Sequence, residues 1–458
     1  MADTTPALDL RTGSQRTFLH LLVSTLVVSV MNFTVWFAVT FWVYLETSSV
    51  FATGLIAGIF LVSIALTGIW FGSLVDHHHK KTVMLWSAAV SMVLYGVCLA
   101  IYLTTPDATF RDPGSARLWV FVVLLMLGVV AGNLRTIAMP TLVTLLIPED
   151  RRDKANGLVG TVNGVAFAIT SVFSGLAIGL LGMGAALAIS IVLTVVALVH
   201  LMTITVAEEK PEPHHDDPKF IDIAGALRAV RIVPGLMALL LFSTFNNFLG
   251  GVFMALMDPY GLSLMSVEAW GVMLGITSMG FIVGGILVAR RGLGANPVRT
   301  LLLANIVLWS ITLVFPIRSE ILPLALGFFL YMALAPVAEA SEQTIVQKVV
   351  PFKEQGRVFG FAQSLETAAS PVTAFLIGPI AQFLVIPAMT DGAGADAIGS
   401  WFGTGPERGM ALIFIVAGGI GLLVTILALR SKAYRNLSAR YAAARSSDDR
   451  ELEGVPAT

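Results

Sequence analysis

The stretch GSLVDHHHKK, residues 72–81, joins two long apolar runs at residues 52–75 and 82–103. Each run reaches the roughly 20 apolar residues that an α-helix needs to cross a bilayer. The polar stretch between them, with one acid, three histidines and two lysines, is then a turn at the membrane surface. Residues 52–103 therefore predict a transmembrane helical hairpin.

The same alternation recurs along the whole chain. Only 12% of the 458 residues are charged and 56% are hydrophobic, whereas soluble domains carry about 25% charged residues. The sequence predicts an all-α polytopic membrane protein with twelve transmembrane helices in two six-helix bundles. The ten other spans are residues 17–44, 118–146, 155–181, 185–207, 234–257, 267–289, 298–317, 321–347, 357–384 and 408–430.

These spans divide the chain into five parts. An N-terminal tail (1–16) precedes the first bundle (17–207), and a linker (208–233) leads to the second bundle (234–430) and a C-terminal tail (431–458). In the linker, Phe220, Ile223, Leu227 and Val230 share one helical stripe, which predicts a short helix lying on the inner membrane surface. The C-terminal tail is basic near the membrane and polar beyond, and we expect it to be frayed.

The distribution of lysine and arginine predicts the orientation. The tails, the linker and the loops on their side hold 23 of the 28 residues, against four in the opposite loops, with Arg135 inside a span. The positive-inside rule then places both termini in the cytoplasm and the chain in the plasma (cell inner) membrane. A net charge of −1 argues against a nucleic-acid partner, and the single Cys98 excludes an internal disulfide.

The two bundles echo each other at an offset of 203 residues. Both matching segments, 147–157 and 350–360, join an even span to the next odd one on the predicted cytoplasmic side. Repeated halves are typical of secondary transporters that rock around a site near the bilayer midplane. The matched pairs are Pro148 with Pro351, Gly157 with Gly360, and Gly175 with Gly378.

The opening stretch resembles a family motif. Residues 72–76, followed by Lys80 and Lys81, are similar to the Gly-x-Leu-x-Asp-Arg-x-Gly-Arg-Lys loop of the major facilitator superfamily. Residues 44–49 and 355–360 resemble its macrolide-efflux and siderophore-exporter branch. The chain departs from the motif at His77 and His79, and it lacks the Gly-Pro element that antiporters of the family often carry in helix 5.

The resemblance implies a gating loop. In such transporters the loop aspartate pairs with the other half in one facing state and releases it in the other. The residues concerned are Gly72, Asp76, His77, Lys80 and Lys81, with Arg357 on helix 11 as the expected contact. Three readings of the histidines remain: a metal site, which we do not expect because a tight turn points the rings apart; pH tuning of the gate; or tolerated loop residues.

Ionisable residues inside spans indicate the transport site, because each costs at least about 2.5 kcal/mol at the bilayer centre. Glu339 and Glu342 are spaced i,i+3 and can share a proton or a cation, and a pair between Arg135 and a glutamate would lower the cost of burying both. The alternative is that these residues only pair helices. The resemblance, in which helices 1, 4, 7 and 10 line a cavity, adds polar and aromatic candidates. The full set is Glu339, Glu342, Arg135, Glu366, Asn32, Trp36, Asn246 and Asn247.

We therefore expect a monomeric, proton-coupled exporter of small amphiphilic molecules, of the drug and multidrug efflux type, working by alternating access in the bilayer. It would need no cofactor beyond the proton gradient. The alternatives are an exporter or flippase of one lipid-like or siderophore-like metabolite, an uncoupled facilitator, and a non-transporting membrane sensor. The chain has no His-Glu-x-x-His, Gly-x-Ser-x-Gly or P-loop motif, which argues against an enzyme.

Overall fold

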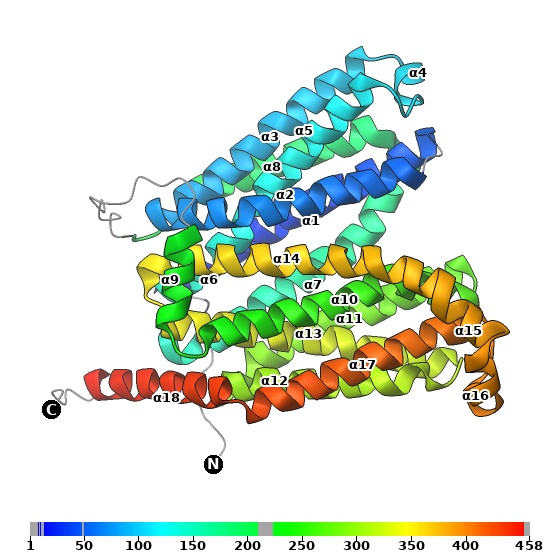
Figure 1. Ribbon diagram of the computed structural model, residues 1–458. Coiled ribbons are helices and arrows are strands. Elements are labelled where there is room, and N and C mark those ends of the chain that lie inside the picture. Colours follow the sequence, from blue (N-terminus) through cyan, green and yellow to red (C-terminus); the bar gives the residue numbers. More distant parts are fainter. Residues whose placement is uncertain (1–7, 9, 11–12, 48–49, 209–222, 453–458) are drawn as a thin grey trace.

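The structure is a computed structural model that describes residues 8, 10, 13–47, 50–208 and 223–452, and in this part of the chain it contains helices and no strands (Figure 1). The first half comprises α1 (Gly13–Thr47), α2 (Val50–His77), α3 (Lys80–Thr104), α4 (Asp107–Phe110), α5 (Ala116–Gly132), α6 (Leu134–Leu146), η1 (Glu149–Arg151), α7 (Arg152–Leu176), η2 (Ala177–Leu181) and α8 (Gly182–Thr203). The linker helix α9 (Ile223–Ile232) follows.

The second half repeats the pattern. It comprises α10 (Leu236–Leu264), α11 (Val267–Arg291), α12 (Pro297–Val314), η3 (Phe315–Ile317), α13 (Ile321–Val349), η4 (Phe352–Glu354), α14 (Gln355–Ile380), η5 (Ala381–Val385), α15 (Ile386–Thr390), α16 (Ala393–Phe402), α17 (Pro406–Arg430) and α18 (Lys432–Leu452). The single-turn helices η1 and η4 each follow a proline, Pro148 or Pro351, at equivalent places of the two halves.

Eleven helical segments within the described residues are long and apolar enough to cross a membrane. They correspond to eleven of the twelve predicted spans. The remaining prediction, residues 155–181, forms the 25-residue helix α7 and the π-helical turn η2. Helix α7 is less apolar because it carries polar residues along its length, including Asn156, Thr161 and Asn163. The predicted helical membrane fold is confirmed.

Local sequence signals explain several helix ends. Ser266 caps α11 by accepting a hydrogen bond from the Ala269 amide at 3.3 Å. Asn296 does the same for α12 through the Arg299 amide at 3.1 Å, and Pro297 occupies the first turn, where a missing amide proton costs nothing. The fourth predicted span is interrupted at Asn133, which separates α5 from α6.

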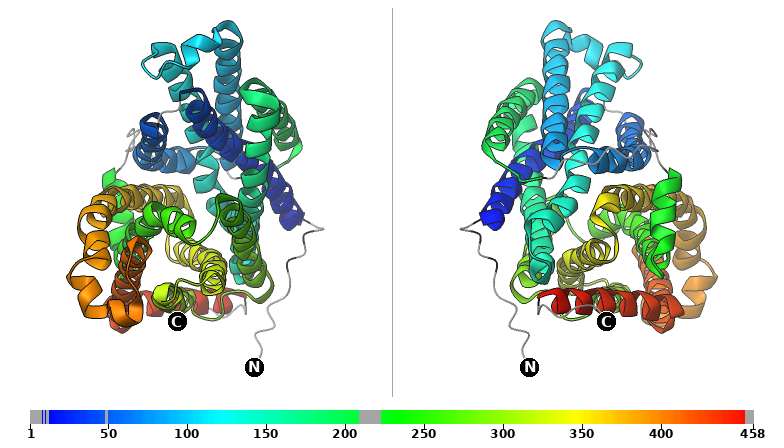
Figure 2. Two further views of the ribbon diagram at one scale, coloured as in Figure 1. Left: turned by 90° about the vertical axis from the view of Figure 1, so that its right-hand side faces the viewer. Right: turned by 90° about the vertical axis from the view of Figure 1, so that its left-hand side faces the viewer.

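The helices lie side by side and define two ends of the molecule. Helices α9 and α18 lie at one end, which we call the linker face, and α4 and α16 lie at the other, which we call the far face (Figure 1). The views turned by 90° show the blue-to-cyan helices of the first half stacked on the yellow-to-red helices of the second (Figure 2). The halves diverge toward the far face (Figure 1).

The buried core follows this divergence. One hydrophobic cluster joins both halves near the linker face, and it includes Phe71 and Leu142 from the first half with Ile345 and Val358 from the second. Toward the far face the cluster around Trp42 contains only first-half residues, and a separate one contains only second-half residues. The molecule is therefore closed at the linker face, and its halves part toward the far face.

One expectation about the connecting segments needs correction. The C-terminal tail is helical through Leu452 as α18, because Leu437 is buried and Ser438 accepts a hydrogen bond from Asn296 at 2.5 Å, which docks the helix on the second half. The linker forms the predicted short helix as α9, in which Ala226, Ala229 and Val230 are buried while Ile223 is exposed, and its place on the membrane surface stays a prediction. Phe220 of the predicted stripe lies outside the described residues.

Candidate functional site

A cavity of about 430 Å³ lies between the halves, mainly within the second half. Helices α10, α12, α13 and α14 form most of its wall, and α6 of the first half contributes Thr136, Ile137 and Pro140. The glutamates and asparagines predicted on the seventh, tenth and eleventh spans, which are α10, α13 and α14, all line it. These lining residues are Glu339, Glu342, Glu366, Asn246 and Asn247.

The three glutamates occupy different positions in this wall. Glu342 on α13 accepts a hydrogen bond from the Ser243 hydroxyl of α10 at 2.5 Å, and its carboxyl group lies within hydrogen-bonding reach of that of Glu366 on α14. Glu339 lies one turn away, is exposed in the cavity, and accepts a bond from Gln343 at 3.2 Å. The sequence predicted a pair between Glu339 and Glu342, whereas the structure joins Glu342 to Glu366.

The two asparagines of α10 are held by side chains and backbone around them. Asn246 donates to the Phe242 carbonyl at 2.7 Å and accepts the indole proton of Trp309 at 2.8 Å. Asn247 donates to the Ser243 carbonyl at 3.1 Å. These bonds use two of the four hydrogen-bonding positions of the Asn246 amide and one of the four of the Asn247 amide, so both residues form a polar part of the cavity wall.

Three residues predicted for the cavity do not line it. The Arg135 guanidinium is buried in the first half and donates to Ser24 at 3.3 Å, so the expected Arg135–glutamate pair is not formed in this state. Asn32 accepts from the Tyr95 hydroxyl at 2.8 Å, behind the cavity wall. Trp36 stacks against Phe60, with ring centres 5.3 Å apart. Their helix assignments were right, but the faces they occupy could not be read from span position alone.

The cavity also contains polar residues that the sequence argument missed. Ser243, Asn305, Tyr331 and Gln363 line it, each on a span that is mostly apolar. Uncharged polar side chains in spans commonly bond to their own helix, as Asn305 does with the Leu301 carbonyl at 2.9 Å. Such residues therefore give no signal for a cavity in one sequence.

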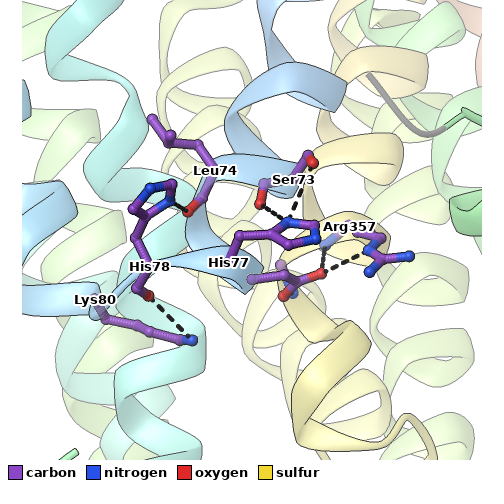
Figure 3. A network of polar contacts seen from close by, with 8 residues as sticks. Ser73, Leu74, His77, His78, Lys80 and Arg357 are labelled. Carbon is purple, nitrogen blue, oxygen red and sulfur yellow. Dashed lines mark hydrogen bonds and ion pairs between the residues drawn. The ribbon is translucent and has the colours of Figure 1, made fainter. Parts of the chain in front are cut away.

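The gating loop makes the contact expected of it. The Asp76 carboxylate at the end of α2 accepts the backbone amide protons of Gly356 at 2.7 Å and Arg357 at 2.8 Å, at the start of α14. The Arg357 guanidinium adds an ion pair at 3.4 Å, and Figure 3 shows it beside the end of α2. A carboxylate at a helix N-terminus is favoured by both the free amides and the helix dipole. Asp76 therefore ties the two halves together at the linker face.

Glycines allow this approach of α2 and α14. A Cβ atom on Gly72 would meet the backbone of Gly356 and Arg357, and one on Gly360 would meet the backbone of Gly68 and Gly72. Small residues at four-residue spacing are what permit helix backbones to pack this closely. The predicted role of Gly72 in the gating loop thus has a steric basis.

The basic residues and the histidines of the loop have separate partners. The backbone amides of Lys80 and Lys81 donate to the Glu208 carboxylate at 2.6 Å and 3.0 Å, which caps α3, and the Lys80 ammonium lies 5.0 Å from the Phe352 ring of the other half. The Nδ1 atoms of His77 and His78 each lie against a carbonyl of their own helix, those of Ser73 at 2.8 Å and Leu74 at 3.1 Å (Figure 3). The Lys80, His77 and His78 side chains therefore point toward different partners.

A second group of contacts between the halves was not predicted. Asn156 on α7 donates to Thr344 and to Gln347 on α13, both at 2.8 Å, and Gln347 donates to the Pro140 carbonyl at 2.9 Å. Asp153 accepts the Leu293 amide proton at 2.8 Å, and Lys348 forms an ion pair with Glu149. One sequence feature pointed to this region, because segment 147–157, which contains Glu149, Asp153 and Asn156, is one of the two segments that match at the 203-residue offset.

All of these bonds lie on the linker-face side of the cavity. Gln347 is five residues beyond Glu342 along α13, which is about 7 Å at the rise of an α-helix. The arrangement is a charged cavity closed on one side by a neutral amide cluster and by two aspartate contacts. That geometry suits a ligand site with alternating access from two sides.

Comparisons with known proteins agree with this architecture. A family model described as Major Facilitator Superfamily matches residues 21–374. Macrolide efflux protein A of Streptococcus pyogenes is 24% identical over 354 residues, which cover 73% of this chain and 82% of that protein.

Solved structures of low sequence identity share the fold. The human organic anion transporter MFSD10 (TETRAN) is 16% identical with a TM-score of 0.67, and the similarity covers 91% of this chain and 100% of that one. A bacterial homologue of the iron transporter ferroportin, in an outward-facing state, is 14% identical with a TM-score of 0.60 over 91% and 100% of the two chains.

Proposed function

We propose that this chain, which belongs to the Major Facilitator Superfamily and is a membrane transporter, exports amphiphilic cations in exchange for protons. The observation that carries the proposal is the charge of the cavity. Three glutamates line it, and its described lining residues include no lysine, arginine or histidine. Such a wall attracts a cation or a proton and repels an anion.

The lining also suits an amphiphilic substrate. Phe242, Tyr331 and Phe359 present aromatic surface beside the glutamates. Aromatic rings and a carboxylate together favour an organic cation with an apolar body. The likeness to a protein described as a macrolide efflux protein supports a substrate of this kind.

Orientation gives the direction of transport. We propose that the linker face is cytoplasmic, since most lysine and arginine residues lie there, and that the protein is a monomer in the plasma membrane. The described state, with its halves parted toward the far face, would then release substrate outward and take up a proton from outside. Rupture of the linker-face contacts would open the cavity to the cytoplasm.

Everted membrane vesicles test the proposal. Uptake of a fluorescent lipophilic cation should follow an acid-inside proton gradient and collapse when an uncoupler is added. A variant with Glu339, Glu342 and Glu366 all changed to glutamine should lose gradient-driven uptake while remaining in the membrane. Uptake that survives the uncoupler would instead indicate an uncoupled facilitator.

A panel of unrelated compounds separates broad from narrow specificity. It should include a macrolide, a quaternary ammonium dye, a neutral amphiphile and an anionic one. The charge of the cavity predicts transport of several cations and little of the anion. Transport of a single lipid-like or siderophore-like compound, with none of the cationic drugs, would overturn the proposal of multidrug efflux.

A further inference from the structure

The three cavity glutamates are not equivalent, and their contacts separate two tasks. We propose that Glu342 and Glu366 together bind the exchanged proton as one pair, while Glu339 binds the cationic group of the substrate. The inference rests on the proposed function and adds an assignment of each carboxyl group. It is carried by the hydrogen bonds of the cavity wall.

Glu342 and Glu366 form a pair of neighbouring carboxyl groups in the cavity wall. Glu342 and Glu366 come from different helices, α13 and α14, and both line the cavity, where their carboxyl groups lie within hydrogen-bonding reach of each other. Two ionised carboxylates offer only acceptors, so a hydrogen bond between them requires one proton. The pair therefore holds a single proton and one negative charge, and it gains a second negative charge when that proton leaves.

The surroundings of the pair contain a hydroxyl donor and no cationic side chain among the described lining residues. The Ser243 hydroxyl of α10 donates to Glu342 at 2.5 Å, which uses one more acceptor site. The titratable groups that face this space from α6, α10, α12, α13 and α14 are the three glutamates and Tyr331. Since the described lining offers no cationic side chain, a proton is the available neutralising charge for the pair.

The surroundings of Glu339 differ from those of the pair. Its side chain is exposed in the cavity, and the side chain bonded to it is Gln343, four residues along the same helix, at 3.2 Å. Gln343 bonds only the Oε1 atom, so Oε2 can accept a bond from a ligand. Glu339 is thus a carboxylate presented to the cavity, whereas the paired groups are committed to each other.

The spacing of the two sites explains how proton binding at the pair is coupled to cation binding at Glu339. Glu339 and Glu342 are one turn apart on α13, so a charge change on the pair is felt at Glu339. When a proton joins the pair, the cavity loses one negative charge and its attraction for a cation falls. When the proton leaves toward the linker face, that charge returns and the cation binds again. One proton is taken up and one released in each cycle.

Infrared spectroscopy on the purified protein in detergent tests the pair without any need for transport. The carbonyl stretch of a protonated carboxyl group should be present at neutral pH in the wild type and in Glu339→Gln. It should disappear in Glu366→Gln and in Glu342→Gln, because a glutamine donates to the remaining carboxylate and no shared proton is required. A stretch that is lost in Glu339→Gln but kept in Glu366→Gln would overturn the assignment.

Equilibrium binding of tetraphenylphosphonium to the same preparations tests Glu339. We expect Glu339→Gln to raise the Kd by about tenfold or more, as removal of one partner of a desolvated charge pair does. Glu366→Gln should still bind the cation but lose the pH dependence of its affinity. An equal loss of affinity in both variants, or a wild type that does not bind the cation, would overturn the division.

The two isosteric variants are matched controls for each other. Each removes one carboxyl charge from the same cavity and keeps the size of the side chain. A general effect of lost charge would therefore appear in both. Failure of gradient-driven uptake in vesicles would refute the proposed antiport while leaving the infrared result intact, so the two failures can be distinguished.

Discussion

Replacing Asp76 by asparagine should weaken closure of the linker face. The carboxylate accepts two backbone amide protons, from Gly356 at 2.7 Å and Arg357 at 2.8 Å, and pairs with the Arg357 guanidinium. Asparagine keeps one acceptor oxygen and turns an NH₂ group toward the other amide. The side chain of Asp76 is 2% exposed, so water cannot readily replace the lost acceptor.

The magnitude follows from these contacts. A hydrogen bond to a charged group contributes about 1.5–3 kcal/mol, and an unpaired buried donor has a similar cost. Loss of one such bond and weakening of the other should cost the closed state about 2–4 kcal/mol. At about 1.4 kcal/mol per tenfold change, the ratio of closed to open molecules should fall roughly 30- to 1000-fold.

Double electron–electron resonance between spin labels on the two halves measures this change in the ratio of closed to open molecules. Labels at Asp150 and Ala295 report the linker face, and labels at Asp112 and Ala397 report the far face, all in a Cys98→Ala background. Asp76→Asn should lengthen the first distance and shorten the second. Both changes are required, because alternating access couples the two faces.

Arg357→Gln is a control that removes only part of the contact between Asp76 and α14. It removes the 3.4 Å ion pair but leaves both backbone amides bonded to Asp76, so we expect a smaller shift than in Asp76→Asn. A folded Asp76→Asn protein with unchanged distances at both faces would refute the reasoning. An effect of Arg357→Gln as large as that of Asp76→Asn would show that the ion pair, and not the helix capping, holds the halves.

Three further outcomes follow from named contacts. Asn156→Ala removes the bonds to Thr344 and Gln347 and should destabilise linker-face closure by about 1–3 kcal/mol, measured with the same labels; unchanged distances would contradict it. Among the described residues the Nε and Nη2 atoms of Arg135 find no hydrogen-bond partner. Arg135→Met should therefore raise the stability against thermal unfolding by up to about 4 kcal/mol while lowering transport. A loss of stability would indicate a structural role for Arg135. His77→Arg places a permanent charge beside Asp76 and should change the linker-face distance measured with the same labels, whereas an unaltered distance would leave His77 a tolerated loop residue.

The sequence by itself determined the membrane fold. Spans of apolar residues must form helices in lipid because every backbone amide has to be bonded within its own segment. Hence the spans could be counted, the linker located, and Asp76 and Arg357 brought together through a family resemblance. The charged residues within spans were also identifiable, since their cost in lipid marks them whatever the packing.

Only the tertiary structure decided which faces of the helices meet. Glu366 was assigned to a span but not to Glu342, because the rotation of α14 against α13 depends on side-chain packing along both helices. The same packing turns Arg135 and Asn32 away from the cavity and brings Asn156 to Gln347 across the halves. Hydropathy records how deep a residue lies in the membrane, whereas partners are set by the direction of each side chain, and that direction is fixed when the bundles assemble.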